Sequence, residues 1–142
     1  MTRLVRALPF ALLPVLAGCV QDSASYMIDG DSDHAIIVMR VQNWFWSSAV
    51  NVTVVAARQP DCLGGLDIKG VTRDTPLVLH QAPDEYAEPI YILEIKGEHY
   101  AVSTYSCRVQ KFPAKPDDAG PEVGRYQEQD GKLRFVAAGK PG

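Results

Sequence analysis

Apolar and polar residues alternate with a period of two through most of the chain beyond its N-terminal quarter. In residues 34–42 every second position, from Ala35 to Val41, carries an apolar side chain. Residues 50–58 repeat the pattern with valine and alanine at alternate positions. Alternation that is rich in β-branched residues is typical of a half-buried strand. We therefore predict a strand in each range, and a third, shorter strand at 76–80, close to a sheet edge because it begins with proline.

Two further pairs of apolar segments have the arrangement of β-hairpins. Residues 88–96 and 99–109 flank a short turn that contains a glycine, and residues 122–129 and 132–136 flank an Asp-Gly pair. Glycine adopts the positive φ that a tight hairpin turn requires. No stretch after the N-terminal segment predicts an amphipathic helix longer than two turns. The pattern as a whole predicts an all-β domain of six to eight short strands, folded as a small antiparallel sandwich or a partly open barrel.

The first eighteen residues have the layout of a secretory signal. Arg3 and Arg6 make the start basic, and residues 7–16 form an apolar run. Ten helical residues rise only about 15 Å, half of the roughly 30 Å hydrocarbon core of a bilayer, so this run is too short for a membrane-spanning helix. A basic start followed by a short apolar run and small residues is typical of an export signal.

The segment ends with Leu16-Ala17-Gly18-Cys19, which resembles the lipobox of bacterial lipoproteins, where an aliphatic residue and two small residues precede a cysteine. The resemblance implies cleavage between Gly18 and Cys19 and attachment of diacylglycerol to the Cys19 sulfur. It also implies an outer-membrane location facing the periplasm, because enterobacterial lipoproteins retained in the inner membrane carry Asp where this chain has Val20. The alternative interpretation is an ordinary secretory signal followed by a chance cysteine.

We divide the chain into a signal peptide (residues 1–18), a lipidated N-terminus with a flexible tether (19–33) and a β domain (34–142). Residues 20–33 are rich in Ser, Asp and Gly and show no sustained periodicity, which is typical of a flexible linker. Alternating aspartates in residues 29–33 begin like an EF-hand loop, but the residues that follow do not complete the pattern. The favoured interpretation of this segment is therefore a solvated acidic linker.

The charge balance bears on possible partners. The formal net charge of the full chain is −3, and loss of residues 1–18 removes two arginines and no acid, which leaves −5. Nucleic-acid binding relies mainly on clustered Lys and Arg, and so does electrostatic adhesion to an anionic membrane surface. The sequence therefore predicts no nucleic-acid partner, and it predicts that membrane lipid is contacted through acylated Cys19.

The two remaining cysteines, Cys62 and Cys107, are predicted to form a disulfide. An exported protein matures in an oxidising compartment, where an even number of cysteines usually pairs. The alternative is a pair of metal-binding or catalytic thiols, but these usually show short spacings with companion histidines. The long spacing here favours a structural bridge.

No catalytic or metal-binding motif stands out. His34, His80 and His99 lie in separate segments, and none of the spacings typical of zinc proteases, serine nucleophile turns or phosphate-binding loops occurs. We therefore predict no catalytic residue, no metal and no cofactor. Any two acidic side chains can still meet in the folded chain, so a small hydrolase stays an open alternative.

The most distinctive local feature is the run Trp44-Phe45-Trp46. In a strand, Trp44 and Trp46 would point to one side and Phe45 to the other. Either the rings are covered, with the indole N–H groups bonded to backbone, or some of this aromatic surface faces solvent. Exposed aromatic residues are common in binding sites, so Trp44, Phe45 and Trp46 are candidate contacts for a protein or glycan partner.

Beyond the export signal, residues 44–46, 56–62 and 131–136 resemble segments of small uncharacterised lipoproteins of proteobacteria. This resemblance implies no particular activity. We expect a non-enzymatic lipoprotein, anchored in the outer membrane, that binds or supports another component of the cell envelope. The alternatives are a module that binds a small ligand or a glycan, and a small periplasmic hydrolase.

Overall fold

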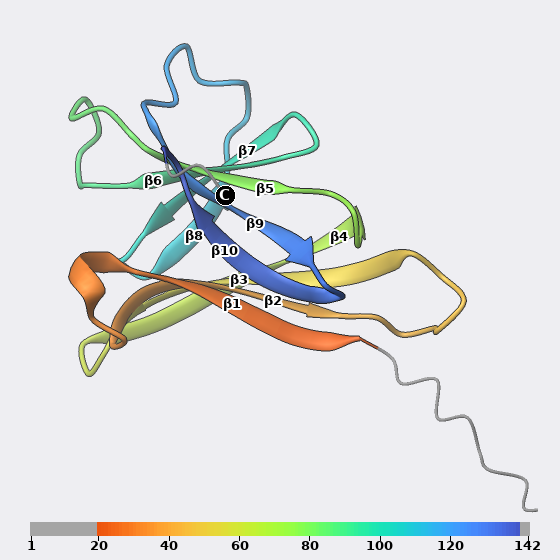
Figure 1. Ribbon diagram of the computed structural model, residues 1–142. Helices are drawn as coiled ribbons and strands as arrows, with labels where there is room; N and C mark the ends of the chain where they lie inside the picture. Colours follow the sequence, from red (N-terminus) through yellow and green to blue (C-terminus); the bar gives the residue numbers. More distant parts are fainter. Residues whose placement is uncertain (1–19, 140–142) are drawn as a thin grey trace, which may run out of the picture.

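Ten strands account for most of residues 20–139, the part of the chain that the computed structural model describes (Figure 1). Most of them show the predicted alternation, because each sheet buries one face and leaves the other to solvent. The elements in chain order are β1 (Gln21–Met27), the 3₁₀ turn η1 (Ile28–Gly30), β2 (His34–Val41), β3 (Ala49–Arg58), β4 (Cys62–Thr72), β5 (Leu77–Gln81), β6 (Tyr91–Ile95), β7 (Glu98–Ser103), β8 (Arg108–Lys111), β9 (Glu122–Gln129) and β10 (Lys132–Ala137).

The strands form two antiparallel sheets packed face to face. The first sheet has the order β1-β2-β3-β4, and the second has the order β10-β9-β5-β6-β7-β8. Each sheet keeps two free edges, so neither closes into a barrel. The prediction of a small all-β sandwich is confirmed. The strand number exceeds the predicted six to eight because β1 and the glycine-rich β4 were not anticipated, and because residues 99–109 divide into β7 and β8.

Both predicted hairpins are confirmed, and glycine makes each turn possible. β6 pairs with β7 and β9 pairs with β10, each antiparallel. Gly97 and Gly131 in the two turns have a φ of 78°. A side chain is strained at that φ, whereas glycine adopts it freely. These short turns place the members of each pair side by side in the second sheet.

The core between the sheets consists of aliphatic residues around one central tyrosine. Val38, Val54 and Leu79 are fully buried, and so is Tyr126. The Tyr126 hydroxyl donates a hydrogen bond of 2.7 Å to the carbonyl oxygen of Ile36. Burial raises the pKa of Tyr126 far above its ordinary value, so the hydroxyl stays a donor. This bond joins the two sheets through the core, because Ile36 lies in β2 and Tyr126 in β9.

The face of β2 that enters the core is not the uniformly apolar one. Ile36, Val38 and Arg40 are buried, whereas Met39 and Val41 are exposed on the outer surface. The buried residues of β2 lie opposite buried residues of β3, which fixes the register of this strand. The first sheet therefore shows apolar side chains on its outer face as well.

The flexible tether predicted for residues 19–33 is wrong from Gln21 onward. β1 pairs with β2 along its whole length, from Gln21 to Met27. Alternate residues of β1 are half-buried, and two of them, Ala24 and Tyr26, pack against the core. The strand forms because β2 offers a free row of backbone donors and acceptors, which small polar residues can pair with as well as apolar ones. The β domain therefore begins with β1 rather than at residue 34.

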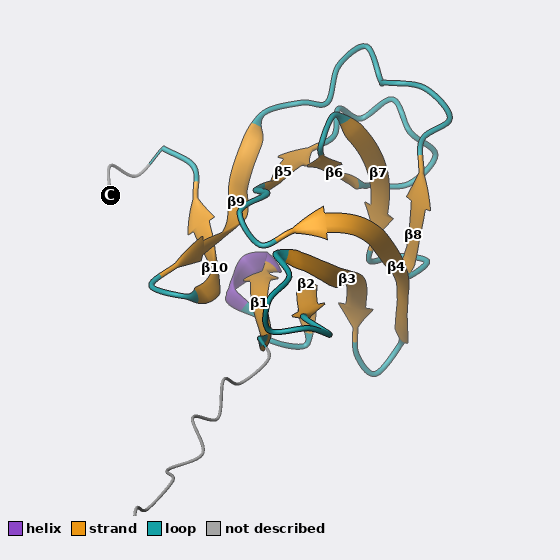
Figure 2. Ribbon diagram, turned by 90° about the vertical axis from the view of Figure 1, so that its right-hand side faces the viewer, coloured by secondary structure: helices purple, strands orange, loops and turns teal. Residues whose placement is uncertain are grey.

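The sheets approach each other along both pairs of outer strands (Figure 2). β1 contacts β10 on one side, and β4 contacts β8 on the other. We call these the β1–β10 edge and the β4–β8 edge. The predicted disulfide between Cys62 and Cys107 is present and fastens the β4–β8 edge, with a Cα–Cα distance of 5.8 Å. The backbones meet closely here, since a Cβ on Gly64 would lie 2.0 Å from the Cys107 carbonyl oxygen.

Candidate functional site

Part of the predicted site lies outside the described residues. Gly18 and Cys19, the predicted cleavage and lipidation residues, precede Val20, where the description begins. No helix within residues 20–139 is both long enough and apolar enough to cross a membrane. What the structure adds about the predicted anchor is the position of Val20, the residue that follows it.

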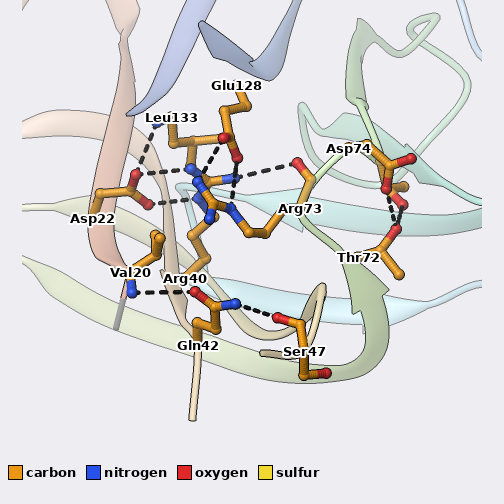
Figure 3. A network of polar contacts seen from close by, with 11 residues as sticks. Val20, Asp22, Arg40, Gln42, Ser47, Thr72, Arg73, Asp74, Glu128 and Leu133 are labelled. Atoms are coloured by element: carbon orange, nitrogen blue, oxygen red, sulfur yellow. Dashed lines mark hydrogen bonds and ion pairs between the residues drawn. The ribbon is translucent and has the colours of Figure 1, made fainter. Parts of the chain in front are cut away.

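Val20 is held at one end of the sandwich, beside the loop that joins β2 to β3. Its carbonyl oxygen accepts a hydrogen bond of 2.8 Å from the backbone N–H of Gln42. Its own N–H donates to the side-chain oxygen Oε1 of Gln42 over 3.4 Å. The Gln42 side chain is buried, and its amide nitrogen also donates to the carbonyl oxygen of Ser47. One glutamine therefore connects the start of β1 to both ends of the β2–β3 loop (Figure 3).

The β2–β3 loop presents Trp44, Phe45 and Trp46, which we call the aromatic cluster. Their exposed fractions are 59%, 61% and 69%. The rings lie against one another, with centroid distances of 5.1 Å between Trp44 and Trp46 and 4.8 Å between Phe45 and Trp46. The alternative in which these rings are covered is therefore wrong for this chain.

The aromatic cluster lies on a turn rather than on a strand. The Ser47 N–H donates to the Trp44 carbonyl oxygen over 3.1 Å, which closes the turn. The Arg73 N–H donates to the Ser48 carbonyl oxygen over 2.9 Å, which ties the loop to the chain after β4. Figure 1 shows this loop projecting from the same end of the sandwich at which β1 begins. The base of the loop is thus fixed, and the three rings form its tip.

Beside this loop, four charged side chains form what we call the ionic network: Asp22, Arg40, Arg73 and Glu128. Arg40 is only 3% exposed and binds both Asp22 oxygens, with Nε–Oδ1 and Nη2–Oδ2 distances of 2.6 and 2.9 Å. Its Nη1 lies 2.7 Å from Glu128 Oε2, and Arg73 donates two further bonds to Glu128. The Leu133 N–H donates to Asp22 Oδ2 over 2.9 Å. The network fastens the β1–β10 edge, as Figure 3 shows.

The ionic network sets the titration of its own carboxylates. Burial by itself raises the pKa of Asp22, but the hydrogen bonds from Arg40 and Leu133 outweigh burial and hold the pKa below its ordinary value. The hydrogen bond from Arg73 is the main reason why the pKa of Glu128 is lowered. The bond to Asp22 raises the pKa of Arg40 in turn. At neutral pH two arginines therefore neutralise two ionised carboxylates at this end of the molecule.

A second exposed apolar surface lies on the outer face of the first sheet, and we call it the sheet patch. It consists of Met27, Met39, Val41 and Leu63, all of which are exposed. Figure 1 shows no described element covering this face. The alternating pattern predicted strands here, but it could not reveal which side of β2 would turn away from the core.

Two histidines that are far apart in the sequence meet at one carboxylate. Glu94 Oε2 lies 3.5 Å from His80 Nε2 and 3.7 Å from His99 Nε2. Pairing of β6 with its neighbours β5 and β7 brings them together, which sequence spacing could not show. His99 is 4% exposed, and His80 Nδ1 donates a hydrogen bond of 3.1 Å to the carbonyl oxygen of Gly120 in the β8–β9 loop. Glu94 therefore contacts both histidines, and His99 also lines a surface pocket beside Lys111 and Phe112.

The third histidine and the possible metal ligands add nothing to this cluster. His34 Nε2 lies 2.7 Å from the Thr104 hydroxyl, in a different part of the fold. Within residues 20–139 no group of three or more His, Cys, Asp or Glu side chains is placed to hold a metal ion.

Compared with protein-family models, curated proteins and solved structures, the chain matches none. The features that bear on function lie together at the end of the sandwich where Val20, the aromatic cluster and the ionic network meet.

Proposed function

We propose that this chain is an outer-membrane lipoprotein that faces the periplasm, is anchored through acylated Cys19, and acts as a non-enzymatic binding or structural component of the envelope. The lipobox at the end of residues 1–18 supports the anchor. The charged side chains that come together in the fold are paired with one another, as in the ionic network, which supports a structural role for them.

The observation that carries the proposal is the position of Val20. Cys19 is joined to it by one peptide bond, and consecutive Cα atoms are about 3.8 Å apart. β1, which begins directly after Val20, starts at one end of the sandwich (Figure 1). Acyl chains on Cys19 can therefore enter a bilayer while both sheets stand clear of it. Two or three acyl chains on one residue also provide an anchor that a single chain does not.

The exposed apolar side chains support a role in binding. The aromatic cluster presents three large apolar side chains in contact with one another, and the sheet patch exposes four more on one face of the first sheet. Exposed apolar patches mark interaction sites in soluble domains. The loop that carries the aromatic cluster projects from the end of the sandwich (Figure 1). A projecting contact fits an extended surface of the envelope better than a small ligand enclosed in a barrel mouth.

The experiment that tests this proposal is Cys19→Ser in the full-length chain, expressed in a Gram-negative host. We expect the unaltered chain to fractionate with membranes, to incorporate labelled fatty acid, and to have a mass that fits cleavage before an acylated Cys19. The variant should lose the label and either leave the membrane fraction or accumulate as the uncleaved precursor.

The matched control is Ser23→Ala, which changes an exposed hydroxyl in β1 close to the same terminus. It should fractionate like the unaltered chain. Unchanged mass, labelling and fractionation in Cys19→Ser would overturn the proposal, because the sulfur would then carry no lipid.

A further inference from the structure

We infer that the aromatic cluster is a second membrane contact, in which Trp44, Phe45 and Trp46 enter the lipid surface next to acylated Cys19. The inference rests on the proposed lipidation, and it adds a role for residues in the folded domain. It also commits the exposed rings to one occupant, the interfacial region of the bilayer in which the anchor sits.

The position of the loop is the first argument. The Gln42 N–H donates to the Val20 carbonyl oxygen over 2.8 Å, so the base of the loop touches the residue that follows Cys19. Acyl chains on Cys19 therefore bring this end of the sandwich to the membrane. From Gln42 to Phe45 the chain advances three residues, which can extend about 10 Å. That reach matches the depth, roughly 5–10 Å, to which interfacial apolar side chains enter the boundary between head groups and acyl chains.

The chemistry of the loop is the second argument. Residues 41–57 contain no charged side chain, so the tip can enter lipid without burying an unpaired charge. Tryptophan is enriched at membrane interfaces because its large apolar ring carries one polar N–H that remains near the head groups. The stacking of Trp44 on Trp46 and the contact of Phe45 with Trp46 gather the three rings into one surface.

The charges around the loop are the third argument. Arg40 and Arg73 lie next to it, but both are engaged with carboxylates of the ionic network. The mature chain is acidic, so its overall charge does not draw it to anionic lipid. A second membrane contact at this end therefore has to be apolar, and the aromatic cluster supplies one.

A lipid occupant also explains why the loop is fixed at its base. Gln42 joins both ends of the loop to Val20, so the rings keep a constant position relative to the acylated residue. An anchor at one residue alone lets a domain pivot. Two contact points on one rigid end hold the long axes of the sheets in one orientation, with the sheet patch turned to the side.

Trp44 and Trp46 are the two tryptophans of the whole chain, so tryptophan fluorescence reports on the aromatic cluster directly. The lipidated full-length product, with its lipid verified by mass, is inserted into vesicles of phosphatidylethanolamine and phosphatidylglycerol. We expect a blue-shifted emission, several-fold stronger quenching by lipids brominated on their acyl chains than by unbrominated lipids, and protection from aqueous iodide.

The matched control moves the reporter to the far end of the same sheet. Leu63, the second residue of β4, has the same exposed fraction as Phe45, 61%. In a chain with Trp44→Phe, Trp46→Phe and Leu63→Trp, the new tryptophan should stay accessible to iodide and should not be quenched by the brominated lipids. The two phenylalanines keep an apolar loop, so the anchor and the fold are retained.

The outcomes separate this inference from the proposed function. A product that carries lipid, but whose Trp44 and Trp46 are as accessible to iodide as Leu63→Trp, overturns the membrane contact and leaves the lipoprotein proposal standing. Tryptophans that are accessible on vesicles but protected in native envelopes also overturn it, because the occupant is then a protein or a glycan. A product without lipid overturns the proposed function itself.

Discussion

At the scale of single residues, Arg40 shows how the fold accommodates a charge between its sheets. The guanidinium is buried, yet all its contacts are with groups that satisfy it: Asp22, Glu128 and the Arg73 carbonyl oxygen. Taking a charge out of water is costly unless partners of opposite charge surround it. Alternation alone did not reveal this arrangement, because it depends on carboxylates from β1 and β9 that approach only after folding.

The lowered pKa values of Asp22 and Glu128 predict a loss of stability in acid. Each carboxylate has a lower pKa in the folded chain than its ordinary value, 3.8 for Asp and 4.5 for Glu, so the unfolded chain takes up protons first. Their contribution is complete above the ordinary values and is lost as the pH falls through the lowered ones. We expect the urea midpoint to fall steadily below about pH 4.5, measured by circular dichroism.

Glu128→Gln tests whether the ionic network causes this loss. The variant removes one of the titrating groups and leaves an amide of similar shape. It should be less stable than the unaltered chain at neutral pH and should show a shallower decline in acid. Parallel declines in the two proteins would contradict the assignment.

At the scale of elements, β1 and β4 are the strands that sequence reasoning missed. The ranges around 34–42, 50–58 and the two hairpins were recognised, because β-branched alternation and turn glycines are local signals. β1 alternates small polar residues with Ala24 and Tyr26, which carries almost no hydrophobic periodicity. Its strand conformation is dictated by the free edge of β2, so no local reading of the residues could find it.

The same distinction explains the aromatic loop. Three successive aromatic residues are typical of a strand or a core, and the sequence left their burial open. The structure exposes them because the turn between Trp44 and Ser47 lies beyond the end of the sheet. What decides the exposure is the pairing of β2 with β3 on either side, which is a tertiary property.

Tyr26→Ala tests whether β1 is part of the fold. The Tyr26 ring lies 5.8 Å from Tyr91 and 5.0 Å from Phe135, centroid to centroid. Removing this half-buried aromatic side chain should lower the free energy of unfolding by about 2 kcal/mol, measured by urea unfolding. Removal of a fully buried aromatic side chain costs more, about 3–5 kcal/mol. It should also speed hydrogen exchange of the backbone amides in β1.

Ser25→Ala is the matched control, because Ser25 is the exposed neighbour on the same strand. It should change stability by no more than about 0.5 kcal/mol. Equal, small effects of both substitutions would show that residues 21–27 behave as a linker in solution.

At the scale of the whole molecule, the sandwich is fastened at its two edges by different chemistry. The ionic network joins the sheets at the β1–β10 edge, and the Cys62–Cys107 disulfide joins them at the β4–β8 edge. The pairing of the cysteines was predictable from their number and the expected compartment. That the disulfide would lie at the edge opposite the ionic network could not be predicted, because its position depends on the order of the strands in the two sheets.

Replacing both cysteines tests the contribution of the disulfide. The bond links residues 45 apart in sequence, and closing a loop of that length should stabilise the fold by about 4 kcal/mol, mainly by restricting the unfolded chain. We expect Cys62→Ala with Cys107→Ala to lose about that much in urea unfolding, and reduction of the unaltered chain to have a similar effect. A loss below about 1 kcal/mol would show that the bond does little for stability.

The early start of β1 limits how far the folded domain can lie from the residue that precedes Val20. A free coil in place of residues 20–33 would have given about 20 Å of additional reach. Because residues from Gln21 onward pair with β2, that additional reach is lost. A domain of this size has a radius of gyration of only about 14 Å. With the proposed anchor at Cys19, the domain would therefore stay close to the membrane surface, and any partner would have to approach that surface.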